Sequence, residues 1–157
     1  MSPQSRTGAR FAFDTPADRV RSFSTLLGVA GIAFGALPFV SPHVFGRLFG
    51  SHVGADPSTA AAYRSVGARD IVLGVGLWSA AYHGGHYGPW VLARLLVDAA
   101  ASAGGLLAIA QGARRPGFLA LVGLSLGTAA ASYRVWQEAR RVDSQPSGAA
   151  LLEQPPA

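Results

Sequence analysis

Four long apolar stretches, separated by short polar segments, dominate the hydropathy pattern of the chain. The first covers residues 23–40 and is apolar apart from Ser24 and Thr25. The others cover about residues 65–82, 90–110 and 117–136. Because about 20 helical residues cross the hydrocarbon core of a bilayer, the pattern predicts an all-α fold, an antiparallel bundle of four transmembrane helices.

Capping and turn residues predict where the helices begin and end. Thr15 followed by Asp18 resembles a capping box, and Asp56 followed by Pro57 is typical of an N-cap before a first-turn proline, which predicts a helix over residues 57–82. Residues 42–55 could form a short interfacial helix between the first two spans. The bundle is expected over residues 16–141, with disordered arms at 1–15 and 142–157.

Two soluble alternatives fit this pattern less well. A water-soluble bundle repeats polar residues along the outer face of each helix, whereas residues 26–40 and 118–131 are weakly polar all round. A signal peptide has its apolar region within about 30 residues of the N-terminus, but here the apolar run starts only at residue 23. We therefore expect a multi-pass protein of the plasma membrane.

The distribution of arginine favours one orientation in that membrane. With the N-terminus inside, the cytoplasmic side carries seven arginines near the span ends and the opposite side carries four. Because basic residues concentrate in cytoplasmic loops, an N-in, C-in topology is expected, with the lipid bilayer as the main partner.

Composition removes several classes of function. Only 13% of the residues are charged, against about 25% in soluble domains. The chain has no cysteine, and all 13 of its basic residues are arginines, so a disulfide scaffold, a thiolate metal site and a Schiff-base lysine are excluded. The net charge is +5, but the arginines are spread along the whole chain, and nucleic acid is not expected as a partner.

Small residues at four-residue spacing predict close helix packing. Gly31 and Gly35 form such a pair in the first span, Gly123 and Gly127 form one in the fourth, and the third span carries alanine and glycine pairs. Helices in lipid associate through close backbone contact at small residues. The bundle should therefore leave little room for a large cofactor, and none is expected. These pairs serve intramolecular packing or a homodimer equally well.

Four charged residues fall inside the second and third spans and need partners. They are Arg69, Asp70, Arg94 and Asp98. Charges at this depth usually pair and face the bundle interior. Antiparallel pairing of these two spans places position 69 opposite roughly position 102, about one turn from Asp98, and predicts an Arg69–Asp98 ion pair supported by Arg94. Asp70 should face another helix, with Arg64 or Arg134 as its partner.

This network supports two functional interpretations. It could be structural or contact a small lipophilic ligand or membrane partner, in a protein that is not an enzyme. Alternatively, Asp70 or Asp98 is the acid or base of a small membrane isomerase or cyclase. An enzyme needs a cavity that reaches a carboxylate, whereas a register device needs carboxylates capped by arginine. His83 and His86 have no further ligand in their loop, so no metal is expected.

Residues 63–74, YRSVGARDIVLG, followed by Arg94 and Asp98 on the next helix, resemble a family of small four-helix integral membrane proteins of unknown function. Its members have a Gly-x-Arg-Asp-x-x-x-Gly signature on the second helix and an aspartate on the third. The resemblance covers roughly residues 24–137. It implies that Arg69, Asp70 and Asp98 matter together, and it brings no established activity.

Overall fold

The structure is a computed structural model that describes residues 15–49 and 56–144. Within these residues it contains five helices and no strand: α1 (Pro16–Val40), α2 (Pro42–Leu48), α3 (Pro57–His83), α4 (Gly88–Ala110) and α5 (Pro116–Asp143). The fold is therefore all-α. Of the predicted arms at 1–15 and 142–157, residues 1–14 and 145–157 lie outside the described residues, as does the 50–55 part of the predicted interfacial segment. α5 ends at Asp143, so the helical bundle extends two residues beyond its predicted end at 141.

Local sequence explains where these helices begin and end. Each helix has proline at one of its first two positions, where the missing N–H would have no intrahelical partner. Thr15 Oγ1 accepts the N–H of Asp18 at 3.1 Å, and Asp56 accepts the N–H groups of Ser58 and Thr59, each at 3.1 Å. The chain leaves α3 at Gly84, whose φ of 67° is left-handed and favours glycine.

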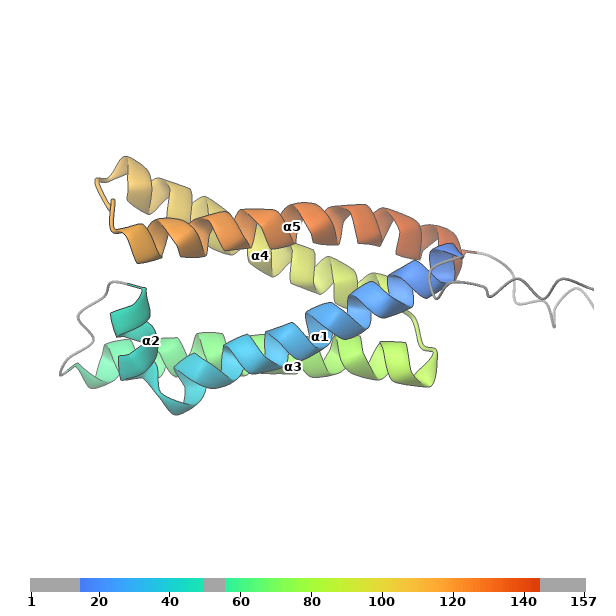
Figure 1. Cartoon of the computed structure of the whole chain (residues 1–157), viewed down its shortest axis with the longest axis horizontal. Helices are drawn as coiled ribbons and strands as arrows, with labels where there is room; N and C mark the ends of the chain where they lie inside the picture. The colour runs from blue at the N-terminus through green and yellow to red at the C-terminus, as the bar shows by residue number, and fades with distance from the viewer. Residues whose placement is uncertain (1–14, 50–55, 145–157) are drawn as a thin grey trace, which may run out of the picture.

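The four long helices form two antiparallel pairs (Figure 1). α1 packs along α3, and α4 packs along α5. The two pairs meet at the end of the molecule that holds the start of α1 and the end of α5, and they diverge toward the end that holds α2. A core cluster that includes Val20, Leu77, Val91 and Ala139, one residue from each long helix, lies where the pairs meet.

Glycines bring α1 and α3 into backbone contact. A Cβ on Gly74 would lie 2.6 Å from the carbonyl oxygen of Gly28, and a Cβ on Gly35 would lie 2.6 Å from the carbonyl oxygen of Gly67. Two glycines at a spacing of seven on each helix thus face each other, so this close packing requires all four positions to lack a side chain.

Two packing expectations need correction. Gly123 and Gly127 were expected to mediate packing, but a Cβ on either would meet nothing within 4 Å. α3 and α4 were expected to be neighbours along their length. Instead they touch over a short region, where Gly76 lies against the ring of Trp90. The physical reason is that the glycine face of α3 fits α1 more closely than it fits α4. The short loop between α3 and α4 therefore does not make these two helices pack along their length.

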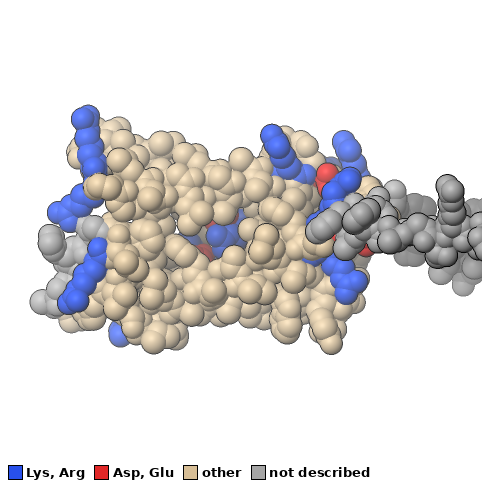
Figure 2. Space-filling view, viewed as in Figure 1, with Lys and Arg blue, Asp and Glu red and all other residues tan. Residues whose placement is uncertain are grey.

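Three helical segments are long and apolar enough to cross a membrane: α1, α4 and Pro116–Arg141 of α5. The predicted span over residues 65–82 lies in α3, which is not among them, because Arg69 and Asp70 interrupt its apolar sequence. Large apolar side chains such as Leu26, Val72 and Leu107 are exposed. The face of the molecule shown in Figure 2 carries arginines at both ends and a wide, largely uncharged zone between them. This surface is that of a membrane protein.

Candidate ligand-binding site

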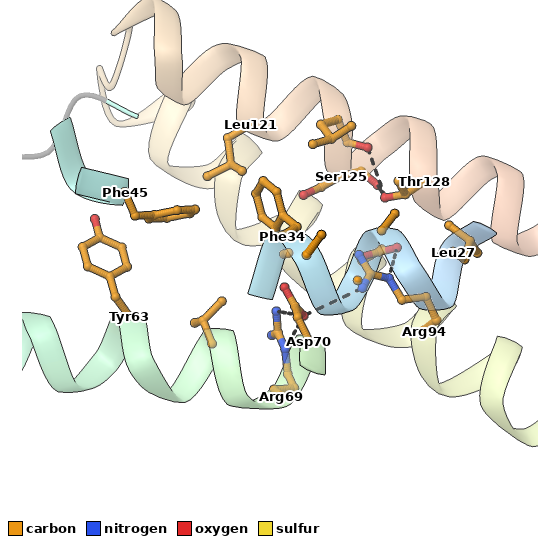
Figure 3. Close-up of a pocket in the computed structure, with 17 residues that line it drawn as sticks. Leu27, Phe34, Phe45, Tyr63, Arg69, Asp70, Arg94, Leu121, Ser125 and Thr128 are labelled. Carbon is orange, nitrogen blue, oxygen red and sulfur yellow. Dashed lines mark hydrogen bonds and ion pairs between the residues drawn. The ribbon is translucent and has the colours of Figure 1, made fainter. Parts of the chain in front are cut away.

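A cavity of about 570 Å³ lies between the two helix pairs. Its walls are mostly apolar and include Leu27, Phe34, Leu121 and Leu124, while Arg69, Asp70, Arg94 and Asp98 form its charged side (Figure 3). The cavity exists because the pairs diverge away from the core cluster. Its volume falls in the range of about 300–1,000 Å³ that is typical of sites for small molecules.

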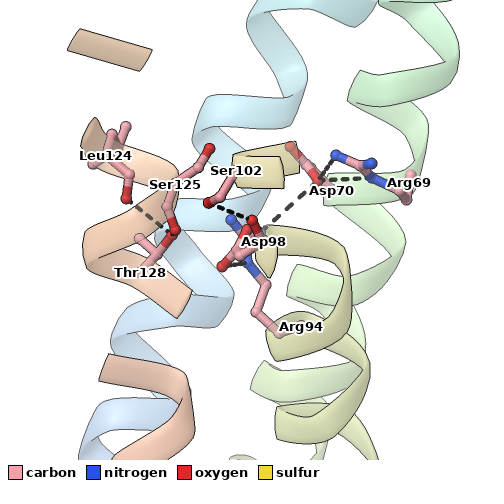
Figure 4. A network of polar contacts seen from close by, with 8 residues as sticks. All are labelled: Arg69, Asp70, Arg94, Asp98, Ser102, Leu124, Ser125 and Thr128. Carbon is pink, nitrogen blue, oxygen red and sulfur yellow. Dashed lines mark hydrogen bonds and ion pairs between the residues drawn. The ribbon is translucent and has the colours of Figure 1, made fainter. Parts of the chain in front are cut away.

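The charged side of the cavity is an ion-pair network centred on Arg94. Arg94 Nε donates to Asp98 Oδ2 at 2.9 Å, and Arg94 Nη1 lies 3.9 Å from Asp70 Oδ1. Arg69 donates to the same Asp70 oxygen from Nε at 3.2 Å and from Nη2 at 3.1 Å. Figure 4 shows Arg94 between the two carboxylates, so it joins α4 to α3.

These four residues were predicted to form a network, but two of the predicted ion pairs are wrong. Arg69 was expected to contact Asp98, but its guanidinium folds onto its own neighbour, Asp70. The expected pairing assumed that α3 and α4 pack along their length, and they do not. Asp70 contacts Arg69 and Arg94 rather than the expected partners, Arg64 and Arg134, which are both exposed.

Most of the network is buried. Asp70 is 3% exposed and Asp98 is 4% exposed, and the Arg94 side chain is 11% exposed, whereas that of Arg69 is 41% exposed. Burying an isolated charge is very costly, but here two guanidinium groups face two carboxylates, and the network is electrically neutral. It can therefore lie at membrane depth.

The network retains unused hydrogen-bonding capacity. Arg94 Nη1 is buried and has no hydrogen-bond acceptor, since its 3.9 Å contact with Asp70 is an ionic contact only. Among the described residues, the arginines contact one oxygen of each carboxylate, Oδ1 of Asp70 and Oδ2 of Asp98. Arg94, Asp70 and Asp98 all line the cavity, which thus offers guanidinium donors and carboxylate acceptors. A ligand hydroxyl matches both, and a ligand carbonyl group matches the donors.

Several lining residues were not identified from the sequence. Ser125 and Thr128 of α5 line the cavity opposite the network, and Tyr63 and Phe45 line its wider end. On α5 the spacing of Leu121, Ser125 and Thr128 puts all three on one face, and two polar residues on one face of an apolar helix were the available signal. Phe45 could not be found in this way, because only the tertiary fold brings α2 to the cavity.

The described residues hold no group of three or more histidine, aspartate or glutamate side chains that could bind a metal ion. His83 lies at the end of α3, with its ring 5.1 Å from that of Tyr82. Neither of the loop histidines, His83 and His86, is among the residues that line the cavity.

Compared with protein-family models, curated proteins and solved structures, the chain shows no significant match to any of them. Its function must therefore be inferred from the cavity and its chemistry.

Proposed function

We propose that this protein is a multi-pass plasma-membrane protein in which all four long helices cross the bilayer. α3 has 27 residues, which is about 40 Å of helix and enough to span. Its glycine contacts hold it along α1, and its buried charge is paired. The start of α1 and the end of α5 lie at the same end of the molecule, which suits an N-in, C-in topology, and α2 would lie at the opposite interface.

The cavity binds a small lipophilic molecule that carries a hydroxyl or carbonyl group. The observation that carries this proposal is the buried ion-pair network, Arg94 included, which lines one side of a cavity whose other walls are apolar. A guanidinium that lines the cavity can donate to a ligand oxygen, and such a charge-assisted hydrogen bond is stronger than a neutral one. The apolar walls would take the remainder of the molecule.

Such a ligand would reach the site from the bilayer. Figure 2 shows a hollow in the middle of the uncharged face, with charged atoms visible inside it. The charged residues that line the cavity are Arg69, Asp70, Arg94 and Asp98. A hollow at this level opens toward lipid tails, which favours molecules that dissolve in the membrane over water-soluble ones.

Two neighbouring alanines on α4 provide the test. Ala101 lines the cavity, whereas Ala100 is exposed and lines no described cavity. The probe is a pyrene-labelled long-chain alcohol, titrated by fluorescence into the full chain in detergent. We expect Ala101→Phe to weaken its binding at least tenfold, and Ala100→Phe to leave it unchanged. Equal effects of the two substitutions would show that the probe binds elsewhere.

A matched probe tests the role of Arg94. The corresponding pyrene-labelled alkane has no hydroxyl and cannot accept a hydrogen bond. We expect Arg94→Gln to weaken binding of the alcohol about tenfold, which is the effect of one charge-assisted hydrogen bond. Binding of the alkane should change little. If both probes lose affinity equally, Arg94 shapes the cavity and does not bind the ligand.

The carboxylate oxygens without an arginine contact favour one alternative, an isomerase or cyclase that uses Asp70 or Asp98 as acid or base. Mass spectrometry of molecules that co-purify with the protein would identify its ligand. Incubation of that ligand with fresh protein then separates binding from catalysis. A catalytic role requires an isomeric product that Asp70→Asn or Asp98→Asn abolishes while binding persists.

A further inference from the structure

A second cavity, of about 370 Å³, lies at the end of the molecule where the helix pairs diverge. It is lined by residues of α2 and its C-cap, by Tyr63 of α3, and by the turn between α4 and α5 together with the start of α5. A Cβ on Gly117 would lie 2.5 Å from the carbonyl oxygen of Leu48. The start of α5 is therefore held against the end of α2, and this contact borders the second cavity.

Aromatic rings separate this cavity from the one that contains the network. Phe45 is buried and touches three rings: its centroid is 5.7 Å from Phe34, 4.6 Å from Phe49 and 5.3 Å from Tyr63. Phe45 and Tyr63 border both cavities. The second cavity is thus a compartment of its own, with aromatic walls suited to methylene groups.

The charge of the second cavity differs from that of the first. Its charged lining residues are Arg114 and Arg115, and no carboxylate is among the described residues that line it. The first turn of α5 also presents backbone N–H groups at this end, and a helix N-terminus favours negative charge. The network in the first cavity has no net charge, whereas the second cavity is cationic. The second cavity therefore favours an anion.

Its depth indicates what kind of anion. Asp98 and Ala110 are twelve residues apart on α4, which is a distance of about 18 Å along the helix axis. Half of a bilayer core is about 15 Å, so a network near mid-membrane places Arg114 and Arg115 at the level of lipid headgroups. Figure 2 shows that arginines gather at this end of the molecule and are absent from the zone beside it.

We propose that this compartment binds a membrane phospholipid with a net negative headgroup. The lipid phosphate contacts Arg114 and Arg115, and the first methylene groups of the lipid lie against Phe45, Phe49 and Phe118. Guanidinium groups recognise phosphate through charge-assisted hydrogen bonds, and the apolar walls exclude a purely polar anion from most of the cavity. This site rests on the proposed spanning topology but not on the ligand proposed for the network.

Native mass spectrometry of the full chain in detergent tests this assignment. The protein is incubated with phosphatidylglycerol, with phosphatidylcholine of the same chains, or with inorganic phosphate. We expect phosphatidylglycerol to be retained at least threefold more than phosphatidylcholine, and no retention of phosphate. Equal retention of the two lipids would refute charge selection, and retention of phosphate alone would make this a site for a free anion.

Paired variants locate the site on the molecule. Arg114→Gln with Arg115→Gln should lower phosphatidylglycerol retention at least about threefold, to the level of phosphatidylcholine. Arg134→Gln with Arg141→Gln removes the same charge from the opposite end and should have no effect. If both pairs lose the lipid equally, net charge and not the cavity attracts it. Arg114→Lys with Arg115→Lys keeps the charge and should retain the lipid, which separates loss of binding from loss of folding.

Discussion

Arg94 Nη1 on α4 lies 3.9 Å from Asp70 Oδ1 on α3, and this buried contact joins the two helix pairs inside the molecule. Its position explains why one residue influences both packing and the cavity. Arg94 neutralises carboxylates on two helices, and the atom that makes the longer contact is also the donor without an acceptor.

Replacing Arg94 with methionine should destabilise the fold strongly. The substitution leaves the buried Asp98 carboxylate without its cation, and breaking a buried ion pair in this way costs about 3–5 kcal/mol. Thermal unfolding in detergent, followed by circular dichroism, measures the effect. Arg69→Met is the comparison and should cost less, because its side chain is 41% exposed and Asp70 keeps its contact with Arg94.

Removing the unpaired carboxylate should reverse part of that loss. Arg94→Met combined with Asp98→Asn leaves a neutral amide in place of a buried charge, so the double variant should be more stable than Arg94→Met alone. Should Asp70→Asn and Asp98→Asn each fold with the yield of the parent, the network would have no structural role.

Adding a methyl group to Gly74 should separate α1 from α3. A Cβ there would lie 2.6 Å from the carbonyl oxygen of Gly28 and 2.8 Å from the backbone nitrogen of Ile32, and backbone cannot move away cheaply. We expect Gly74→Ala to cost about 2 kcal/mol or more in the free energy of unfolding. Gly123→Ala, whose Cβ meets nothing, should be neutral or stabilise by up to about 1 kcal/mol. An equal loss in both would contradict the observed helix contact.

The N-cap of α3 should make stability depend on pH in the acid range. Hydrogen bonds from the side chains of Ser58 and Thr59, and from their backbone N–H groups, hold the pKa of Asp56 far below its ordinary value of 3.8. A carboxyl with a lowered pKa stabilises the fold fully above its unfolded pKa, and this contribution is lost as the pH falls below it. Stability should therefore fall below about pH 4.

Comparison with Asp56→Asn isolates this group from the other carboxylates. Asparagine is also a good N-cap, but it does not titrate. The difference in melting temperature between parent and variant should be constant from pH 7 to about pH 5 and should move in favour of the variant below about pH 4. A difference that stays constant down to pH 3 would exclude the cap as the cause.

The proposed topology can be tested with introduced cysteines, because the chain has none of its own. Gln111 lies at the turn between α4 and α5, and Ser144 lies just after α5, at the opposite end of the molecule. In intact cells a membrane-impermeant maleimide should label Gln111→Cys and should not label Ser144→Cys. The reverse pattern would establish N-out, C-out, and labelling of both would exclude a spanning α5.

Much of the secondary structure could be predicted because its causes are local. The prolines at the helix starts, the caps at Thr15 and Asp56, and the end of α3 near Gly84 depend on a few neighbouring residues. α3 was expected over residues 57–82 and extends to His83. The four charged residues of the network were also identifiable, because charges inside apolar stretches are conspicuous and need partners.

The sequence by itself therefore determined the helices, the membrane character and the four charged residues of the ion-pair network, although Arg64 was expected there as well and is exposed. Only the tertiary structure decided that α3 pairs with α1, that Arg69 turns to Asp70, and that α2 brings Phe45 to both cavities. The physical reason is that helix pairing depends on how closely two whole faces fit. Gly28 and Gly74 show this, because the close contact needs a glycine on each of two helices that are far apart in the sequence. A local sequence pattern cannot reveal such a contact.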